Sequence, residues 1–281
     1  MIRVFVSLAA LATGLEVPVF PLRKPRFPTE TLRLNLFEPR YLNLARSVTS
    51  AEDAVFAAMY CGDVPSVLPR GDQPPTPLLA PDAVGVLCEV TNSETLDSGR
   101  VALRATAFSR CKLVSVLSSP ATGGREPYVV VDAEPLLDDL EPDAAEKERE
   151  TARAVADVEH LLDKLWGPFN SCETPSDDDD DDALRYDAVR RFAPNLVDDE
   201  CVVAELERQY CLVSGACGDF APTREELYSF SLLSTLDLAP RDKQLALEST
   251  NTLDRFRHVF ADLRRGRNWL AARAALTDLR L

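Results

Sequence analysis

The first half of the chain carries the alternation of apolar and polar residues that is typical of β-strands. Every second residue of segment 31–36 is leucine, so three leucines share one face of the strand and polar residues occupy the other. The same period of two recurs in segments 84–90 and 101–107 and in a short valine-rich segment at 128–132. Short strands joined by loops with Pro and Gly favour a closed or nearly closed antiparallel sheet over residues 17–135.

A β-hairpin is predicted in the middle of this region. The turn-forming cluster Asp97-Ser98-Gly99 separates two alternating segments. Arg100 and Arg104 fall on the face of the second segment that points away from its apolar residues. The apolar face of the pair is expected to consist of Val84, Val86, Cys88, Val90, Val101, Leu103, Ala105 and Ala107.

Helical spacing interrupts the strands once and then dominates the second half of the chain. After Pro39, apolar residues recur at Tyr41, Leu44, Ala45 and Val48, which predicts a short helix. Apolar stripes at helical spacing then follow in five places: Val155, Val158, Leu162 and Leu165; Val202, Leu206 and Tyr210; Phe230, Leu233 and Leu236; Leu253, Phe256, Phe260 and Leu263; and Trp269, Ala272, Leu276 and Leu279.

The ends of these helices also have sequence signals. A first long helix is predicted to start near Pro142. The sequence Thr223-Arg224-Glu225-Glu226 is a capping box, in which the Thr223 hydroxyl and the Glu226 carboxylate are expected to bind N–H groups at a helix start. Pro240 is expected to open a long helix that Gly266 interrupts.

The chain is therefore expected to be an α+β protein with a strand-rich part and a helical part. We expect an N-terminal segment at 1–16, a β-domain at 17–137, and an α-helical domain at 138–281 that contains an acidic loop at 173–183. The six consecutive aspartates Asp177–Asp182 repel one another and lack apolar neighbours, so this loop is expected to stay solvated. It lacks the spaced ligands and the turn glycine of an EF-hand calcium loop.

The charge balance argues against nucleic acid as a partner. The net charge is −15, and residues 138–210 alone hold 8 basic and 23 acidic residues. Nucleic-acid binding needs a broad basic face, whereas this chain offers only the patch Arg23-Lys24-Pro25-Arg26 and a mildly basic C-terminal stretch.

Other features indicate an intracellular protein of the cytoplasm or a plastid. No stretch approaches the roughly 18 consecutive apolar residues of a membrane-spanning helix. The 7 cysteines are odd in number, scattered and without a C-x-x-C pair, which favours reduced thiols in a reducing compartment. Residues 1–12 are similar to a very short signal peptide, but their short apolar run and single arginine favour a first strand or a targeting remnant over secretion.

No motif for catalysis is present. None of the 11 glycines is followed by lysine, so the phosphate-binding G-x-x-x-x-G-K-[ST] loop is missing. H-E-x-x-H, C-x-x-C and G-x-S-x-G motifs are missing as well. A Ser–His or Cys–His mechanism would depend on His160 or His258, which both fall in amphipathic helical stretches. We therefore expect no enzyme, metal site or cofactor, and no small-molecule ligand.

Two motifs in the first half carry a family resemblance. The segment Val17-Pro18-Val19-Phe20-Pro21-Leu22 is followed, after a gap, by Leu32-Arg33-Leu34-Asn35-Leu36-Phe37-Glu38-Pro39-Arg40-Tyr41-Leu42. A proline-bracketed strand, a loop, a leucine-alternating strand and then F-E-x-R-Y resemble the opening of the N-terminal (LON) domain of Lon protease.

The likeness continues along the chain to about residue 263. Gly85–Val90, Asp97–Arg100 and Phe108–Leu113 resemble later strands and a turn of the family, although Ala107 replaces an expected glycine and Cys111 an expected aromatic residue. The family's closing helices are similar to Tyr228-Ser229-Phe230, Lys243–Glu248 and Asp254-Arg255-Phe256.

The resemblance implies a PUA-like antiparallel β-barrel followed by a helical bundle, which Lon uses to recognise protein substrates. Because the ATPase and Ser–Lys protease domains of Lon are missing from these residues, the chain resembles the stand-alone LON-domain proteins of plants and algae. The implied function is a non-catalytic module that binds other proteins, through unfolded or apolar segments, as an adaptor in protein quality control or degradation. An RNA-binding PUA-like module and an uncharacterised hydrolase are the alternatives.

The candidate partner-binding residues are those of the two motifs: Phe20, Pro21, Leu22, Phe37, Glu38, Pro39, Arg40 and Tyr41. Most of them are expected to hold the fold, with Phe20, Leu22, Phe37 and the leucines of segment 31–36 in the barrel core.

The charged and aromatic residues of the corner have expected places as well. Glu38 and Arg40 are expected to pair and brace the helix, with Tyr41 packed beneath it. The loops 23–28 and 65–81 are expected to be exposed, beside a sheet edge or groove that takes an extended peptide by strand addition.

Overall fold

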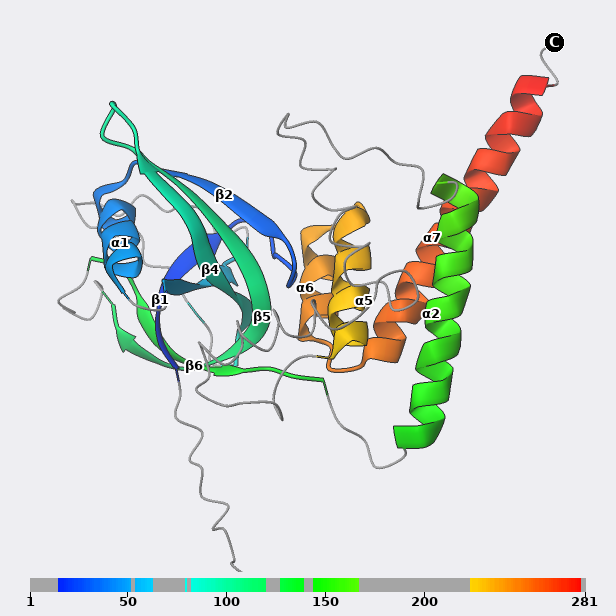
Figure 1. The fold of residues 1–281 in the computed structure, drawn as a ribbon, viewed down its shortest axis with the longest axis horizontal. Helices are drawn as coiled ribbons and strands as arrows, with labels where there is room; N and C mark the ends of the chain where they lie inside the picture. Colours follow the sequence, from blue (N-terminus) through cyan, green and yellow to red (C-terminus); the bar gives the residue numbers. More distant parts are fainter. Residues whose placement is uncertain are drawn as a thin grey trace, which may run out of the picture.

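The computed structural model confirms the α+β class, with the strands in the first half of the chain and the long helices in the second (Figure 1). The structure describes residues 15–51, 54–62, 79, 82–119, 127–138, 144–166 and 223–278. Within the two longest helices, it describes side chains only at 149–162 and 252–266. The strands are β1 (Leu15–Leu22), β2 (Thr31–Leu36), β3 (Val55–Tyr60), β4 (Val84–Thr95), β5 (Val101–Ser118) and β6 (Val130–Pro135). The helices are α1 (Pro39–Ser50), α2 (Ala144–Trp166), α5 (Arg224–Thr235), α6 (Pro240–Glu248) and α7 (Thr252–Asp278).

The sheet closes on itself to form a barrel. Its order is β2-β5-β4-β3-β1-β6, and β6 also pairs with β5, so that β1, β3, β4, β5 and β6 form a ring. Strand β2 lies outside this ring, paired with the first part of β5. The expectation of an antiparallel barrel holds for every described pair of strands except β1 and β3, which run parallel. A parallel pair needs a long crossover connection, which β2 and α1 supply here.

The predicted hairpin and its apolar face are confirmed. Strands β4 and β5 are antiparallel and meet at a turn in which Gly99 has a positive φ of 74°. Arg100 and Arg104 are exposed, as the alternation predicts. The buried residues of the apolar face are Val84, Val86, Cys88, Val101, Leu103, Ala105 and Ala107, and Val90 packs against them.

Strand β3 was not expected, because its sequence does not alternate. Its middle residues, Phe56 to Met59, are all buried. Ala57 and Met59 point into the barrel, whereas Phe56 and Ala58 point to the outer core, so both faces of the strand are covered. A short apolar run that is buried on both faces has no period of two to recognise.

Two hydrophobic cores lie on the two faces of the barrel wall. The inner core fills the barrel and includes Val19, Leu87 and Val131. The outer core is larger: it joins the outside of the barrel wall to α1 and to the helices of the second half, where it includes Phe230 and Phe256. The barrel and the helices therefore share one core and stabilise one another.

A β-bulge in β5 decides which side chains face the helices. Cys88 of β4 pairs with Ala107 and Leu87 pairs with Ser109, so Phe108 is an extra residue in β5. An extra residue shifts the alternation of the strand by one position. The side chain of Arg110 consequently points to the helices, although the period of the preceding residues would direct it into the barrel.

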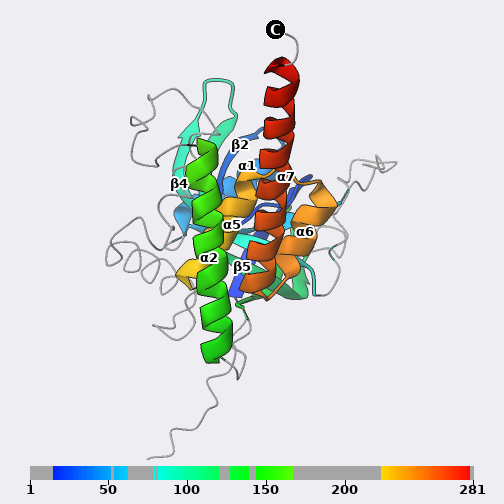
Figure 2. The same cartoon turned by 90° about the vertical axis from the view of Figure 1, so that its right-hand side faces the viewer.

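The helices of the second half form two layers on one side of the barrel, opposite α1 (Figure 1). Helices α5 and α6 lie next to the barrel, and α2 and α7 lie side by side on the far side of α5 (Figures 1 and 2). The predicted stripe on α2 is confirmed for Val155, Val158 and Leu162, which are buried. The predicted helix around residues 202–210, the acidic loop and the start of α2 at Pro142 lie outside the described residues.

The expectation of one long helix that starts at Pro240 and is interrupted at Gly266 is wrong in two respects. The helix is interrupted earlier, between α6 and α7, where the carbonyl oxygens of Leu247 and Ser249 accept hydrogen bonds from arginine side chains. Asn251 then caps α7 by accepting a hydrogen bond from the Asp254 N–H. Helix α7 continues through Gly266, since a single glycine inside a helix costs only about 1 kcal/mol.

The close approach of β3 and β4 requires a glycine at position 85. A Cβ atom on Gly85 would lie 2.2 Å from the Met59 sulfur and 2.6 Å from the Ala58 carbonyl oxygen. We expect Gly85→Ala to lower the free energy of unfolding by about 1–3 kcal/mol, as overpacking does in a tight core. Urea denaturation followed by circular dichroism measures this change.

Gly266 is a matched control for the same substitution. A Cβ atom there would meet nothing within 4 Å, and the residue is exposed inside α7. Gly266→Ala should therefore raise the free energy of unfolding by up to about 1 kcal/mol through helix propensity. Equal effects of the two substitutions would contradict the close approach at Gly85.

Candidate functional site

The motif corner between β2 and α1 places one of the predicted core residues in solvent. Phe37 is 62% exposed, so the expectation that it belongs to the barrel core is wrong. Leu32, Leu34 and Leu36 point inward from β2, and the alternation turns the following residue outward. The guanidinium of Arg100 lies 5.8 Å from the centre of the Phe37 ring.

The remaining corner residues hold α1 against the barrel, largely as expected. Pro39 is in the first turn of α1, and an oxygen of Glu38 lies 2.6 Å from a guanidinium nitrogen of Arg40. The Arg40 guanidinium lies over the Tyr41 ring, 4.6 Å from its centre, and that ring contacts Phe20 at 4.8 Å between centroids. Burial raises the pKa of Tyr41 to about 12. Phe20 and Leu22 pack against the outer core.

The loop before β2 is only partly exposed, which corrects the expectation for residues 23–28. Arg23 and Lys24 are exposed, but Phe27 is buried and contacts Phe230 of α5 at 5.5 Å between ring centroids. The ammonium group of Lys243 lies 4.7 Å from the centre of the Phe27 ring. This loop therefore attaches the barrel to α5 and α6. Of the proline-rich segment 65–81, the structure describes only Leu79.

An ion pair between Glu30 and Lys243 also strengthens this attachment of the loop to α6. One oxygen of Glu30 lies 2.5 Å from the Lys243 nitrogen, and the other accepts a hydrogen bond from the Phe27 N–H at 3.0 Å. Glu30 is buried, so its charge is balanced within the protein rather than by water.

Between barrel and helices lies a buried network of charged side chains, which begins at Arg110 of β5. Its Nε and Nη2 donate to the same oxygen of Glu226, at 3.2 and 2.8 Å. Nη2 also donates to Asp138 at 2.7 Å, and Nη1 donates to the carbonyl oxygens of Leu247 and Ser249 at 3.0 and 2.7 Å. All five N–H groups of this guanidinium are thus used.

Arg255 of α7 completes the network from the other side. It donates to the Ser229 hydroxyl at 2.7 Å, to both oxygens of Asp138, to the Ser249 carbonyl oxygen and to the Thr252 hydroxyl. Both guanidiniums lie over the ring of Phe230, with centroid distances of 5.1 Å for Arg110 and 4.2 Å for Arg255. Two cations, two carboxylates and one aromatic ring therefore join β5, α5, α7 and the chain after β6.

The network also explains a difference from the predicted capping box. Thr223 accepts a hydrogen bond from the Glu226 N–H at 3.1 Å, as expected. The Glu226 carboxylate does not serve the helix start: its Oε1 accepts from Arg110 instead. A buried guanidinium needs a balancing negative charge more than an exposed N–H group needs a partner other than water.

The two carboxylates of the network titrate differently. Burial, followed by the charge of Asp138, raises the pKa of Glu226 against the opposing effect of Arg110 and Arg255. Burial also acts to raise the pKa of Asp138, but hydrogen bonds and attraction from Arg255, with attraction from Arg110, lower it overall. As the pH falls, Glu226 is therefore protonated before Asp138.

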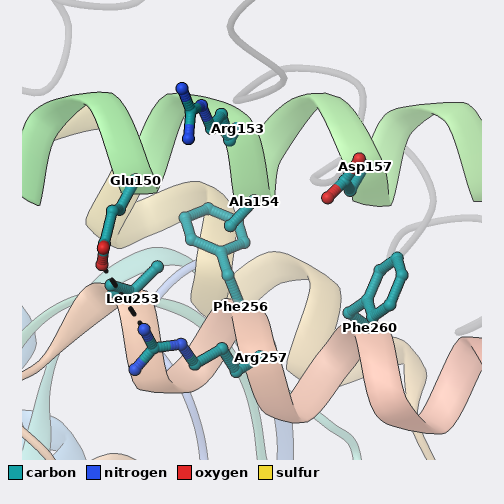
Figure 3. A pocket seen from close by; sticks show the side chains of 8 residues that line it. All are labelled: Glu150, Arg153, Ala154, Asp157, Leu253, Phe256, Arg257 and Phe260. Carbon is teal, nitrogen blue, oxygen red and sulfur yellow. Dashed lines mark hydrogen bonds and ion pairs between the residues drawn. The ribbon is translucent and has the colours of Figure 1, made fainter.

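An open groove of about 280 Å³ with an apolar floor lies between α2 and α7 (Figure 3). Ala154 of α2 and Leu253, Phe256 and Phe260 of α7 form its floor. Charged residues of both signs surround it: Glu150, Arg153 and Asp157 from α2, and Arg257 from α7. An oxygen of Glu150 lies 3.4 Å from a nitrogen of Arg257 across one end. This groove is suited to apolar side chains on a partner that is polar elsewhere.

The comparison with family models decides what this architecture is. The model described as the substrate-binding domain of the ATP-dependent protease La (LON) matches residues 16–265. The chain belongs to the LON substrate-binding domain family. The match runs from β1 into α7, so it includes the barrel, the charged network and the groove. It is to the substrate-binding part of the protease, not to its catalytic part.

Solved structures of Lon N-terminal domains are similar to this LON domain at low identity. The N-terminal domain of Lon protease from the Mycobacterium avium complex is 11% identical, with a TM-score of 0.47, over 89% of this chain and 98% of that chain. A Lon N-terminal domain protein from Xanthomonas campestris is 16% identical, with a TM-score of 0.43, over 88% and 97%. No curated protein sequence matches the chain.

The groups that the hydrolase hypothesis needs do not come together in the described part of this LON domain. His160 on α2 and His258 on α7 are both exposed on helix surfaces. The described cysteines are free thiols, and burial raises the pKa of Cys61 to about 11, that of Cys111 to about 12 and that of Cys88 well above its usual value. Such thiols stay protonated at neutral pH and are poor nucleophiles.

The same described residues contain neither a metal-binding cluster nor a membrane-spanning helix. No group of three or more His, Cys, Asp or Glu side chains there is arranged to hold a metal ion. No described helix is long and apolar enough to cross a membrane.

Sequence reasoning missed the charged network, although its two arginines lie in motifs that carried the resemblance. Arg110 follows the β-bulge, and Arg255 stands in the Asp254-Arg255-Phe256 motif. An arginine flanked by residues of an apolar strand or stripe is the one signal of burial that the sequence offers. Its partner Asp138 stands among many carboxylates, and the capping-box pattern assigned Glu226 to the helix start, so the sequence pointed to neither as a partner of an arginine.

Removing one carboxylate from the network should destabilise this LON domain. We expect Asp138→Asn to lower the free energy of unfolding by about 3–5 kcal/mol, because it leaves a buried guanidinium without its balancing charge. Glu150→Gln is the control, since it breaks an exposed ion pair worth at most about 1 kcal/mol. Chemical denaturation of the three proteins measures both changes, and comparable losses would contradict the role of the network.

The same variant predicts a pH dependence. The pKa of Asp138 is lower in the folded than in the unfolded chain, so its contribution is present above about pH 4 and is lost as the pH falls through the folded-state value. The stability difference between the wild type and Asp138→Asn should therefore be largest near neutral pH and shrink below about pH 4. Denaturation curves over this range measure it, and a constant difference would show that Asp138 does not stabilise as an anion.

Proposed function

We propose that this LON domain is a non-catalytic module that binds exposed apolar segments of other proteins and serves as an adaptor in protein quality control or degradation. The observation that carries the proposal is the family match over residues 16–265, since the matching model is that of a substrate-binding domain. Recognition of exposed apolar segments is a suitable task for an adaptor, because folded proteins bury such segments and damaged proteins expose them.

The groove between α2 and α7 is the proposed site for an apolar side chain of the bound segment. Its floor is aromatic and aliphatic, and Phe260 is half-buried, so that a ligand covers its remaining surface. The charged rim carries two acidic and two basic side chains and therefore selects no strong net charge in the partner. Binding would rest on apolar burial in the floor, at roughly 25 cal/mol per Å² of surface removed from water.

The compartment and the non-catalytic role belong to the same proposal. The free thiols of Cys61, Cys88 and Cys111 support a reducing compartment such as the cytoplasm or a plastid. The exposed positions of His160 and His258 support binding rather than hydrolysis. The negative overall charge supports protein rather than RNA as the partner.

Peptide binding to groove variants tests the proposal. The full chain is expected to bind fluorescent apolar peptides in preference to polar peptides of equal length and charge, as measured by anisotropy. Phe260→Ala should weaken binding by up to about tenfold, because a ligand covers only the part of the ring that is still exposed. Ala154→Phe should weaken it too, because the new ring fills the groove without removing a contact.

Leu245→Ala is the control for both groove variants. Leu245 is an exposed leucine of α6 that does not line the groove, so its removal should leave peptide affinity unchanged. The proposal fails if the wild-type chain does not distinguish apolar from polar peptides. Peptide binding that survives both groove variants would place the site elsewhere on the domain.

A further inference from the structure

The groove between α2 and α7 follows two turns of both helices. Every residue that lines it belongs to one of these helices, at positions i, i+3, i+4 and i+7 counted from Glu150 on α2 and from Leu253 on α7. Two turns of helix correspond to about 10 Å. At one end of the groove, Glu150 pairs with Arg257. Asp157 and Phe260 lie at the other end (Figure 3), so the two helices run in the same direction and the groove is parallel to both axes.

The walls of the groove offer side chains but no free backbone groups. Apart from Leu253 in the first turn of α7, the lining residues have their N–H groups bonded within their own helix. An extended peptide in the groove would therefore leave its own N–H and C=O groups without partners above an apolar floor, which is unfavourable. A helical peptide satisfies these groups internally. The groove consequently favours a helix over a strand as its ligand.

The open part of the floor matches apolar side chains one turn apart. Leu253 and Phe256 are already buried, whereas Ala154 and Phe260 are each only half-buried. The surface that a ligand can still cover is therefore mainly that of Ala154 and Phe260. Apolar residues at i and i+4 of a helix lie on one face, one turn apart, and can cover both along a groove of two turns.

The rim adds a charge pattern that a partner helix can match. Glu150 and Arg257 are already paired across one end, at 3.4 Å. Arg153 and Asp157 are exposed, and neither forms an ion pair with a described residue. These two side chains have opposite signs and lie one turn apart on α2. A partner helix with an acidic and a basic side chain one turn apart would pair with both.

We propose that the groove binds a short amphipathic helix of another protein, with apolar residues one turn apart and flanking side chains of both signs. The inference rests on the proposed function and deepens it, since it names the conformation and the charge pattern of the bound segment. Surface helices of globular proteins carry such an apolar stripe against their own core, and a damaged protein exposes it. The ligand is therefore a kind of segment that an adaptor in quality control would meet.

A segment of another protein fits the groove better than a second copy of the chain. A stable dimer needs about 800 Å² of buried surface on each partner, from some 20–30 residues, and the groove is lined by 8 residues. Two copies would also repel one another, since each carries a net charge of −15. A short helix that binds reversibly meets neither obstacle.

Two forms of one peptide test the conformation of the ligand. The probe is a capped alanine-based peptide of about 15 residues, with two leucines at i and i+4 and one glutamate and one lysine beside them. Its control has the same sequence with two outward-facing alanines in the D form, which disrupts the helix and keeps every side chain. By titration calorimetry, the full chain should bind the helical form at least tenfold more tightly. Equal affinities would overturn the inference.

Substitutions on α2 test the place of binding. Ala154→Phe should weaken binding of the helical probe at least tenfold, because the new ring fills the groove. Ala156→Phe is the matched control, since Ala156 is exposed on α2 outside the groove, and it should leave the affinity unchanged. Arg153→Glu and Asp157→Lys should each weaken binding about threefold or more, and less so at high salt. Circular dichroism of each variant establishes that it is folded.

The outcomes separate this inference from the proposed function. If apolar peptides bind in the groove and the D-containing form binds as well as the helical one, the proposed function stands and the inference is overturned. If no apolar peptide binds, both proposals fail. Binding of the helical probe that survives Ala154→Phe overturns the inference as well.

Two further outcomes would identify a different occupant of the groove. Leu206 belongs to the apolar stripe that the sequence predicts at 202–210. If Leu206→Glu in the full chain raises the affinity for the probe, the chain itself competes for the groove and the inference is overturned. If sedimentation shows a dimer that Ala154→Phe dissociates, and the probe does not bind, the occupant is a second copy and the inference is overturned too.

Discussion

The structure depends on two arginine side chains buried between a β-barrel and a set of helices. Arg110 and Arg255 bring two positive charges into a buried region, where their N–H groups need carboxylates, hydroxyls and carbonyl oxygens as partners. These partners come from the chain after β6, from α5 and from the break between α6 and α7. Such a network does little for net stability compared with an apolar core, but almost any misplacement of one element would leave a buried charge unpaired. It therefore specifies how the helices sit on the barrel.

The local irregularities of the fold serve this arrangement. The bulge at Phe108 turns Arg110 from the barrel interior to the helices. The break after α6 frees the carbonyl oxygens of Leu247 and Ser249 for the arginines. The Glu226 carboxylate balances the charge of Arg110 instead of capping the start of its own helix. Phe230 lies under both guanidiniums and contacts Phe27 of the loop before β2, so the same ring connects the network to the second attachment of the barrel.

A domain fixed in this way can present binding surfaces on elements that do not move when a ligand arrives. The groove lies between α2 and α7, which the shared core holds against α5. Its floor is apolar, and it is small compared with a stable protein interface. Under the proposed function, a surface of this size would bind short segments weakly and release them.

The sequence by itself determined the strands and helices whose two faces differ. The period of the apolar residues shows which face is buried and which is exposed to solvent in β2, in the hairpin of β4 and β5, and in α1 and α2. It also carried the family, because the Phe37–Tyr41 corner and the spacing of its flanking strand are local in the chain. Tertiary structure alone decided the rest. Strand β3 is buried on both faces and has no period, Phe37 turned outward where a core residue was expected, and the parallel pair β1–β3 depends on a crossover. Asp138 and Arg255 are 117 residues apart, and a carboxylate acquires its role only when folding removes the water around a distant guanidinium.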